Sequence, residues 1–279
     1  MNRGNRLNLS RWILISFVLL IGFSNVLAKN VVYENAYTNT YGEEVEFSYE
    51  NIPDMYIPES EVSYSGDDIN TYGVGHGIAM IVSPNVEGVT VKIIHSGAEA
   101  IDKLRIVGEA IGNTEVFTIK PIKQRDEVTT KNVPIGISYF SLKLPMTSCD
   151  MEYKITAYGI EEGQPVVLRS ANASLKYNES QLMEWHPGTF ATCTQTVDYH
   201  FYKHSKEIGA PHLMSYLIKA SVQRAEIEKS LLDLSAINKY YITTPDGKIP
   251  STKFQLYGSQ RYLMWTNNEH RILSFGGVF

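Results

Sequence analysis

An alternation of apolar and polar residues with a period of two most constrains what this chain can fold into. It is clearest in the segment Tyr153–Ile160, where Tyr153 and Ile155 fall on one side of an extended chain and Lys154 and Thr156 fall on the other. A period of two is that of a β-strand with one buried and one solvated face. The segment therefore predicts a strand at the surface of a β-sheet core.

Further runs of similar character surround this segment and are separated by turn residues. They are Ile78–Val82, Val89–His95, Asp102–Ile111, Thr114–Ile122, Ile135–Leu144 and Val166–Tyr177. Short strands at such a spacing predict a mainly β protein, with a β-sandwich over residues 79–178. In this pattern the segment resembles an immunoglobulin-like or fibronectin-III-like domain. Such folds carry many unrelated functions, so the resemblance implies an architecture and no activity.

Two further assignments rest on composition. The segment Gln124–Lys131 is polar and predicts a hairpin or connecting loop, whereas Phe190–Tyr202 is rich in β-forming residues and predicts extended chain. Residues 29–78 predict one or two edge strands and loops ahead of the sandwich.

The pattern changes after Ser180 and predicts a smaller α+β unit over residues 179–279. Pro211 suits the first turn of a helix, and apolar residues recur at three- and four-residue steps after it. We therefore expect one long amphipathic helix over Pro211–Asn238. Short strands are expected to follow it, at Tyr240–Thr243, Lys253–Tyr257 and Arg261–Thr266.

Two charged residues fall on the apolar side of this expected helix. Arg224 and Glu228 are four residues apart, which favours a mutual ion pair whose alkyl stems cover apolar surface. The alternative is a charged pair kept for the specificity of a partner.

The N-terminus has the composition of a secretory signal peptide over residues 1–28. Three arginines precede an apolar run from Trp12 to Phe23, and Val26 and Ala28 occupy the small-residue positions of a cleavage site. The run is too short to cross a membrane, which needs about 20 helical residues. An uncleaved signal anchor is the alternative. Cleavage predicts a secreted or periplasmic protein without a membrane span.

The charge of the expected mature chain disfavours nucleic acid as a partner. Removal of residues 1–28 takes away three arginines and no acid, which leaves 22 basic and 30 acidic residues and a formal charge of −8. An acidic surface repels phosphate backbones.

The chain has two cysteines, Cys149 and Cys193. In an exported protein such a count predicts one disulfide, which would close a loop of about 45 residues and stabilise the fold by at most about 4 kcal/mol. Two free thiols buried as small apolar side chains are the alternative.

A cluster of histidines is the strongest candidate for chemistry. If residues 198–206 are helical, His200 and His204 lie one turn apart on one face, and His212 or Asp198 would complete a zinc site. The arrangement resembles that of zinc metallopeptidases but lacks their glutamate after the first histidine. If the segment is a strand, the two imidazoles lie about 13 Å apart and cannot share an ion. Surface histidines are the alternative.

No nucleophile motif accompanies this cluster, and no catalytic residue is assigned. The 18 tyrosines suit a recognition surface, and exposed sheet edges suit strand addition. We therefore expect a non-enzymatic binding or assembly protein that acts on a protein partner of the cell envelope, without a required cofactor. A zinc-dependent hydrolase and a secreted toxin or effector are the two alternatives.

Overall fold

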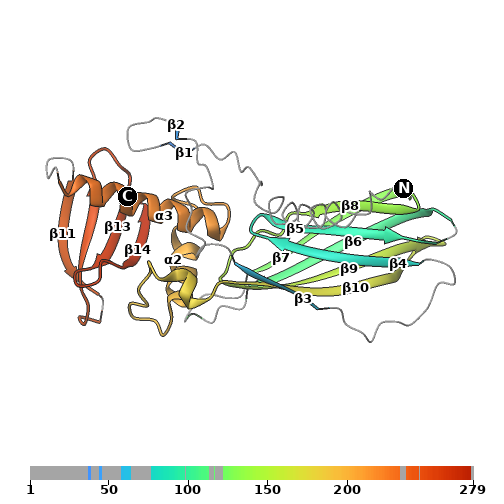
Figure 1. Cartoon of the computed structure of the whole chain (residues 1–279), viewed down its shortest axis with the longest axis horizontal. Coiled ribbons are helices and arrows are strands. Elements are labelled where there is room, and N and C mark those ends of the chain that lie inside the picture. Colours follow the sequence, from blue (N-terminus) through green and yellow to red (C-terminus); the bar gives the residue numbers. More distant parts are fainter. Residues whose placement is uncertain are drawn as a thin grey trace, which may run out of the picture. The chain divides into compact units, whose positions relative to one another are not determined.

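The computed structural model describes most of the chain beyond residue 57 (Figure 1). The described residues are 37–38, 44–45, 58–63, 77–97, 99–112, 116, 122–232, 237–244 and 246–277. Contacts divide the chain into two units, Met1–Ile52 and Pro53–Phe279. The predicted signal peptide and most of the predicted strand Thr114–Ile122 lie outside the described residues.

The first unit is described only at two short strands, β1 (Tyr37–Thr38) and β2 (Glu44–Val45), which pair antiparallel. In the second unit the predicted sandwich and the predicted α+β part belong to the same compact unit. Among the described residues, no helix has the length and hydropathy needed to cross a membrane.

The protein is mainly β, as the period-two alternation predicts. One sheet has five antiparallel strands in the order β3 (Glu59–Ser63), β10 (Gln164–Lys176), β9 (Asp150–Glu161), β6 (Ile101–Gly112) and β7 (Lys123–Val133). A second sheet has three antiparallel strands, β4 (Ile78–Asn85), β5 (Gly88–His95) and β8 (Gly136–Leu142).

These two sheets face each other and bury apolar side chains between them (Figure 1). Leu104 and Ile155 of the larger sheet and Val91 and Ile93 of the smaller one are fully buried. The packing between the sheets is tight at Gly108, because a Cβ atom there would lie 2.6 Å from a methyl carbon of Leu142. A larger residue at this position of β6 would have to displace these buried side chains.

The remaining part of the unit combines helices with a third sheet. It contains the 3₁₀ helix η4 (Glu179–Leu182), α2 (Cys193–His204), α3 (Leu213–Ser230) and an antiparallel sheet in the order β11 (Ile237–Thr243), β12 (Pro250–Leu256), β13 (Arg261–Thr266), β14 (Ile272–Gly277). The α+β character of this region and its strands thus agree with the sequence prediction.

The extended conformation predicted for Phe190–Tyr202 is wrong, because most of that segment forms α2. The Thr192 side chain accepts a hydrogen bond from the Gln195 amide and begins the helix. Cys193, Val197 and Phe201 follow at four-residue spacing and are all buried. This tertiary burial outweighs the β propensity of the individual residues.

The loop predicted at Gln124–Lys131 is also wrong, because the segment lies within the edge strand β7. Its residues alternate between exposed and half-buried, and an edge strand tolerates such a polar sequence. The predicted helix Pro211–Asn238 is shorter than expected, since α3 begins after His212 and ends at Ser230. The predicted ion pair Arg224–Glu228 is present, with Nε and Oε1 3.0 Å apart.

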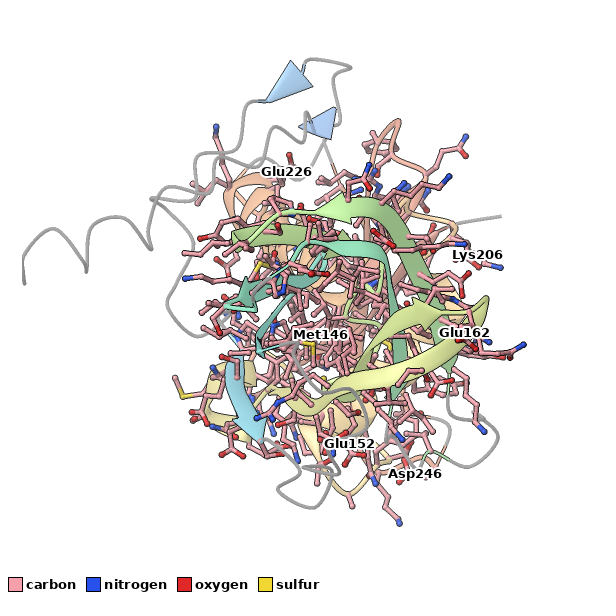
Figure 2. The ribbon with its side chains drawn as sticks, turned by 90° about the vertical axis from the view of Figure 1, so that its right-hand side faces the viewer. Met146, Glu152, Glu162, Lys206, Glu226 and Asp246 are labelled. Atoms are coloured by element: carbon pink, nitrogen blue, oxygen red, sulfur yellow. The ribbon has the colours of Figure 1, made fainter. Side chains whose placement is uncertain are left out.

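The helical region is joined to the connection between β8 and β9 by hydrogen bonds. Asp198 of α2 accepts a hydrogen bond from the Cys149 amide at 2.6 Å and one from the Ser148 hydroxyl at 2.8 Å. The Leu213 amide donates to the Met146 carbonyl. Figure 2 shows Met146 in the interior, while charged side chains such as Glu162 and Lys206 lie at the periphery.

Candidate functional site

Helix α2 brings two of the predicted metal ligands together. The rings of His200 and His204 stack with centroids 5.8 Å apart and an interplanar angle of 10°. His204 Nδ1 lies 2.7 Å from Glu207 Oε2, and its Nε2 lies 3.3 Å from the Tyr262 hydroxyl. Ser274 Oγ lies 3.0 Å from that hydroxyl and 3.2 Å from His200 Nδ1. The five side chains form one continuous polar chain.

The surroundings shift the pKa values of His200 and Glu207. Burial, with the neighbouring His204 and Lys203, lowers the pKa of His200 to about 3. Burial alone would raise the pKa of Glu207, but hydrogen bonds to His204 and from the Gly277 amide outweigh it and lower that pKa. His200 is therefore a neutral hydrogen-bonding group at physiological pH.

The other two predicted ligands lie elsewhere. Asp198 is committed to Ser148 and Cys149. His212 caps α3, where its Nδ1 accepts a hydrogen bond from the Ser215 amide at 3.2 Å. The structure therefore separates the four residues into three places.

The stacked pair also has the wrong shape for a metal. The two ring planes are nearly parallel with centroids 5.8 Å apart, and His200 Nδ1 and both nitrogens of His204 already have protein partners, whereas zinc needs ligand nitrogens about 2.0–2.1 Å from one ion. Across the described part of the chain, no group of three His, Cys, Asp or Glu side chains is arranged to hold a metal ion. This geometry gives no support to the predicted zinc site or to a hydrolase built on it.

The histidine cluster instead joins α2 to the edge of the third sheet. A Cβ atom at Gly276 would lie 2.7 Å from the His204 ring, so a glycine in β14 makes room for the imidazole. Tyr262 and Ser274 come from β13 and β14. These contacts describe a helix-to-sheet junction whose polar groups satisfy one another.

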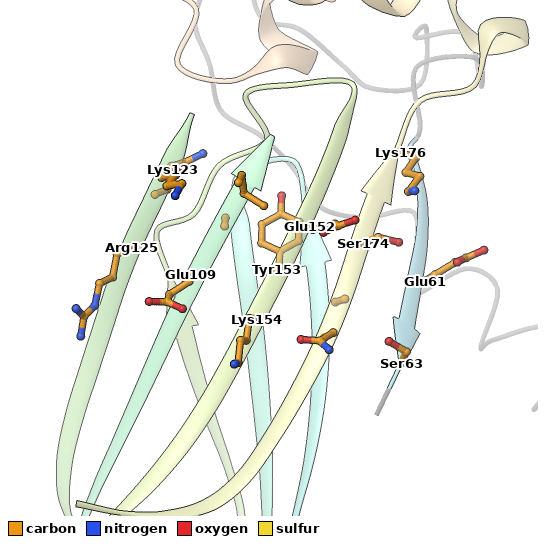
Figure 3. A pocket seen from close by; sticks show the side chains of 15 residues that line it. Glu61, Ser63, Glu109, Lys123, Arg125, Glu152, Tyr153, Lys154, Ser174 and Lys176 are labelled. Atoms are coloured by element: carbon orange, nitrogen blue, oxygen red, sulfur yellow. The ribbon is translucent and has the colours of Figure 1, made fainter. Parts of the chain in front are cut away.

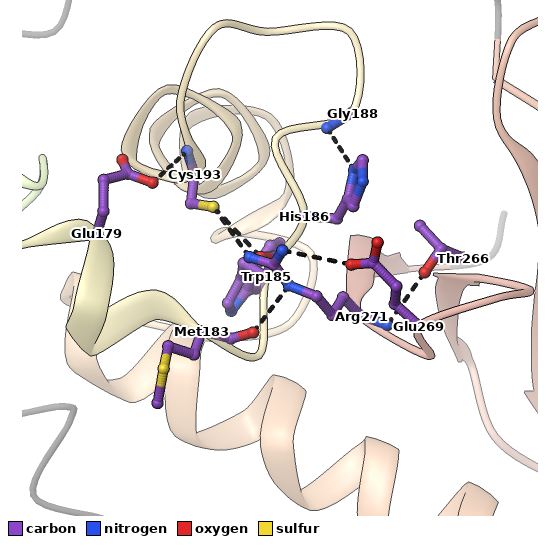
Figure 4. Close-up of polar contacts among 9 residues, drawn as sticks. All are labelled: Glu179, Met183, Trp185, His186, Gly188, Cys193, Thr266, Glu269 and Arg271. Carbon is purple, nitrogen blue, oxygen red and sulfur yellow. Dashed lines mark hydrogen bonds and ion pairs between the residues drawn. The ribbon is translucent and has the colours of Figure 1, made fainter.

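Both cysteines are free buried thiols, so the structure does not contain the predicted disulfide. Each cysteine is engaged in its own region. The Cys193 amide donates to Glu179, and the Cys193 thiol donates to the Trp185 carbonyl at 3.2 Å (Figure 4). Burial and Glu179 together raise the pKa of Cys193 to about 11. Burial, with Asp198 nearby, raises the pKa of Cys149 well above its ordinary value.

Arg271 closes the region around Cys193 (Figure 4). Its guanidinium donates to the Met183 carbonyl at 2.9 Å, to the Trp185 carbonyl, and to the Cys193 sulfur at 3.4 Å. One side chain thereby satisfies acceptors at both the turn after η4 and the start of α2. We call this arrangement the Arg271 clamp, because its three hydrogen bonds hold neighbouring parts of the protein together.

The candidate binding surface lies on the outer face of the five-stranded sheet. A pocket with a volume of about 1080 Å³ opens there and is lined by all five strands (Figure 3). Register places two rows of outward side chains across it. One row is Ser63, Asn172, Lys154, Glu109 and Arg125, and the other is Glu61, Ser174, Glu152, Ile111 and Lys123.

Charges of opposite sign alternate in the first of these rows. Lys154 lies between Asn172 and Glu109, and Glu109 lies directly opposite Arg125. Within the described residues, neither Glu109 nor Lys154 has a partner within 4.0 Å, whereas Arg125 and Glu127 pair at 3.4 Å beside the pocket. Ionic groups of the pocket therefore remain available to a ligand.

The lining has little aromatic surface. Tyr153 is the one aromatic residue among the lining side chains of the described chain, and it is only 1% exposed because its ring points into the core. Recognition on this face therefore rests on hydrogen bonds and charge.

No protein-family model matches the sequence, and a search of curated proteins also finds no match. The pocket must accordingly be interpreted from its own residues.

Sequence reasoning did not identify this pocket. The alternation within Tyr153–Ile160 correctly places Lys154 on the solvated side, but the residues beside it come from strands far apart in the sequence. The signal that was present is the set of charged residues on the polar side of the strands, such as Glu152 and Lys154 of β9. The order of the strands in the sheet brings these residues together, and that order cannot be read from the local sequence pattern.

Proposed function

We propose that this chain is an exported, non-enzymatic binding protein that holds an extended, charged polypeptide segment of a cell-envelope partner. The segment would lie on the outer face of the five-stranded sheet. The observation that carries the proposal is the pocket to which all five strands contribute, with unpaired charges of both signs.

A polypeptide fits this pocket better than a nucleic acid or a carbohydrate. The lining intersperses Glu61, Glu109 and Glu152 among four basic residues, so it matches a uniformly charged polyanion less well than a segment that carries both signs. Exposed aromatic rings, on which sugars stack, are missing from the described lining. A peptide with alternating acidic and basic side chains would match the row of Lys154, Glu109 and Arg125.

The strand order supports a fibronectin-III-like interpretation of the two facing sheets. Strands β4, β5 and β8 form one sheet, and β7, β6, β9 and β10 are neighbours in the other. This division of seven consecutive strands between two sheets is the one expected of a fibronectin-III-like domain. Strand β3 then adds to β10 as a fifth strand. Domains of this type serve as recognition modules in many proteins, which agrees with a binding role but does not specify one.

Export is the part of the proposal that rests on residues 1–28 alone. Their arginines, apolar run and cleavage-site residues support a secreted or periplasmic location. A five-stranded β-sheet with a polar outer face suits an assembly role in the cell envelope.

In-cell photo-crosslinking tests the binding function. A photoreactive amino acid replaces Asn172, which lines the pocket beside Lys154, and cells that produce the protein are irradiated. We expect one discrete higher-mass adduct, and we expect Lys154→Glu in the same protein to reduce it at least several-fold.

The matched control carries the photoreactive residue at Thr129. This residue is exposed on β7, on the same face of the sheet, but is not part of the pocket lining. Adducts of equal yield from both positions, or none from position 172, would contradict binding at the pocket.

A further inference from the structure

Strand β11 leaves an open edge on the third sheet. It pairs with β12 over its whole length of seven residues, without a register shift, and no described segment pairs with its other side. Its side chains are unusually exposed for apolar residues: Tyr240 is 50% exposed, Tyr241 79% and Ile242 37%. Tyr241 and its two neighbours point to opposite faces of the sheet, so apolar surface flanks the open edge on both sides.

The other edges of the three larger sheets have protecting features that β11 lacks. At the opposite edge of the same sheet, Ile272 of β14 exchanges main-chain hydrogen bonds with Glu184 and His186. The short strand β3 carries Glu59 and Glu61, and β7 is rich in charge. Strand β4 contains Pro84 and β8 contacts β7. Natural proteins blunt edges by such devices, and β11 has only Lys239 for the purpose.

We propose that β11 is a docking edge for a second copy of this chain, which pairs with it antiparallel about a two-fold axis. When all seven residues pair, Tyr240 lies opposite Tyr240 of the second copy, and Ile237 lies opposite its Thr243. The only charged residue of the strand, Lys239, then lies opposite Tyr241 rather than another lysine. The edge is therefore self-complementary in charge, and each Lys239 gains a cation–π partner.

This pairing joins the two four-stranded sheets into one sheet of eight strands. A two-fold axis makes the contact closed, so it does not propagate into fibres. The interface is small, because two partly exposed tyrosines from each copy supply most of its apolar area and a fully buried tyrosine contributes about 150–250 Å². We therefore expect a concentration-dependent dimer with a dissociation constant in the micromolar range.

Sedimentation velocity of the purified mature protein over a range of concentrations tests the proposal. The wild type is expected to shift from monomer to dimer as concentration rises. The variant Tyr241→Lys places like charges opposite each other at two symmetric positions and is expected to stay monomeric. The double variant Lys239→Glu with Tyr241→Lys restores opposite charges at those positions and is expected to dimerise again.

Tyr257→Lys is the matched control, since Tyr257 is 58% exposed but lies in the turn after β12 and not on the open edge. It should dimerise as the wild type does. Circular dichroism melts of each variant establish that a monomeric result does not come from unfolding.

Cysteine cross-linking locates the contact independently. Tyr240→Cys should form an intermolecular disulfide on mild oxidation, because residue 240 lies opposite its own copy. Asn238→Cys should not, since it lies opposite residue 242. Cys149 and Cys193 are 1% and 3% exposed and do not compete. A wild type that stays monomeric at about 1 mM, or a dimer that Tyr241→Lys leaves intact, would overturn the proposal.

Discussion

Acidification should destabilise the fold through His212, a histidine that caps a helix while it is buried. The side chain is 5% exposed, its Nδ1 accepts the Ser215 amide, and its Nε2 is buried without a partner in the described structure. Burial, with Lys219 nearby, lowers the pKa of His212 to about 4 from an ordinary value of 6.5. Protonation at Nδ1 would also remove the acceptor on which the cap depends.

The sign and size of the effect follow from proton binding. Between pH 6.5 and pH 4 the unfolded chain binds a proton at His212 that the folded chain does not, so stability falls as pH falls through this window. From pH 7 to pH 5 the loss is about 2 kcal/mol, because each pH unit below the unfolded pKa costs about 1.4 kcal/mol per proton. His200 adds a similar loss over the same window, since its pKa is also lowered.

The substitution His212→Asn separates this contribution from the others. Asparagine is a good helix N-cap and does not titrate, so the cap remains while the pH dependence is lost. Urea unfolding at pH 7 and pH 5, followed by the fluorescence of the buried Trp185 and Trp265, measures both proteins. Between pH 7 and pH 5, the free energy of unfolding of the variant should fall by about 2 kcal/mol less than that of the wild type.

The control is His270→Asn, the same substitution at an exposed position whose φ of 54° asparagine tolerates. It should follow the wild-type pH dependence. If His212→Asn also follows the wild type, the buried capping imidazole is not a source of acid sensitivity and the reasoning fails.

Three further substitutions test the junctions of the fold. Asp198→Ala removes the acceptor of two buried hydrogen bonds and should destabilise the protein by about 3 kcal/mol in urea unfolding, whereas a loss below about 1 kcal/mol would contradict the role given to this carboxylate. Arg271→Lys cannot reach all three acceptors of the guanidinium, so native-state labelling of Cys193 by a thiol reagent should accelerate; an unchanged rate would count against the clamp. Gly108→Ala introduces a methyl group 2.6 Å from Leu142 and should lower stability by about 1–3 kcal/mol, with an unchanged thermal midpoint as the opposing result.

The sequence predicted strands where one face is buried and the other is solvated. Tyr153–Ile160 lies within β9, and Arg261–Thr266 coincides with β13. These strands were predictable because burial of one face of a strand selects apolar residues at every second position. Prediction failed where local composition and tertiary packing disagree. Strand β7 is polar because it lies at an edge, and α2 is helical because Val197 and Phe201 are buried.

The candidate site was less predictable than the fold. A local pattern places His200 and His204 on one face of a helix, but it does not show that Tyr262 and Ser274 already occupy their nitrogens. The pocket depends on strand order, which follows from long-range pairing. Lys154 and Arg125 lie in the same row only because β6 pairs with both of their strands and places Glu109 between them.

The most direct test of the proposed function is the binding of purified mature protein to arrayed extended peptides of systematically varied charge. We predict that peptides with alternating acidic and basic side chains bind best. Lys154→Glu should abolish this preference, while Lys131→Glu, exposed on β7 outside the pocket, should retain it. Binding that is independent of peptide charge pattern, or equally weakened by both substitutions, would contradict a recognition site on the five-stranded sheet.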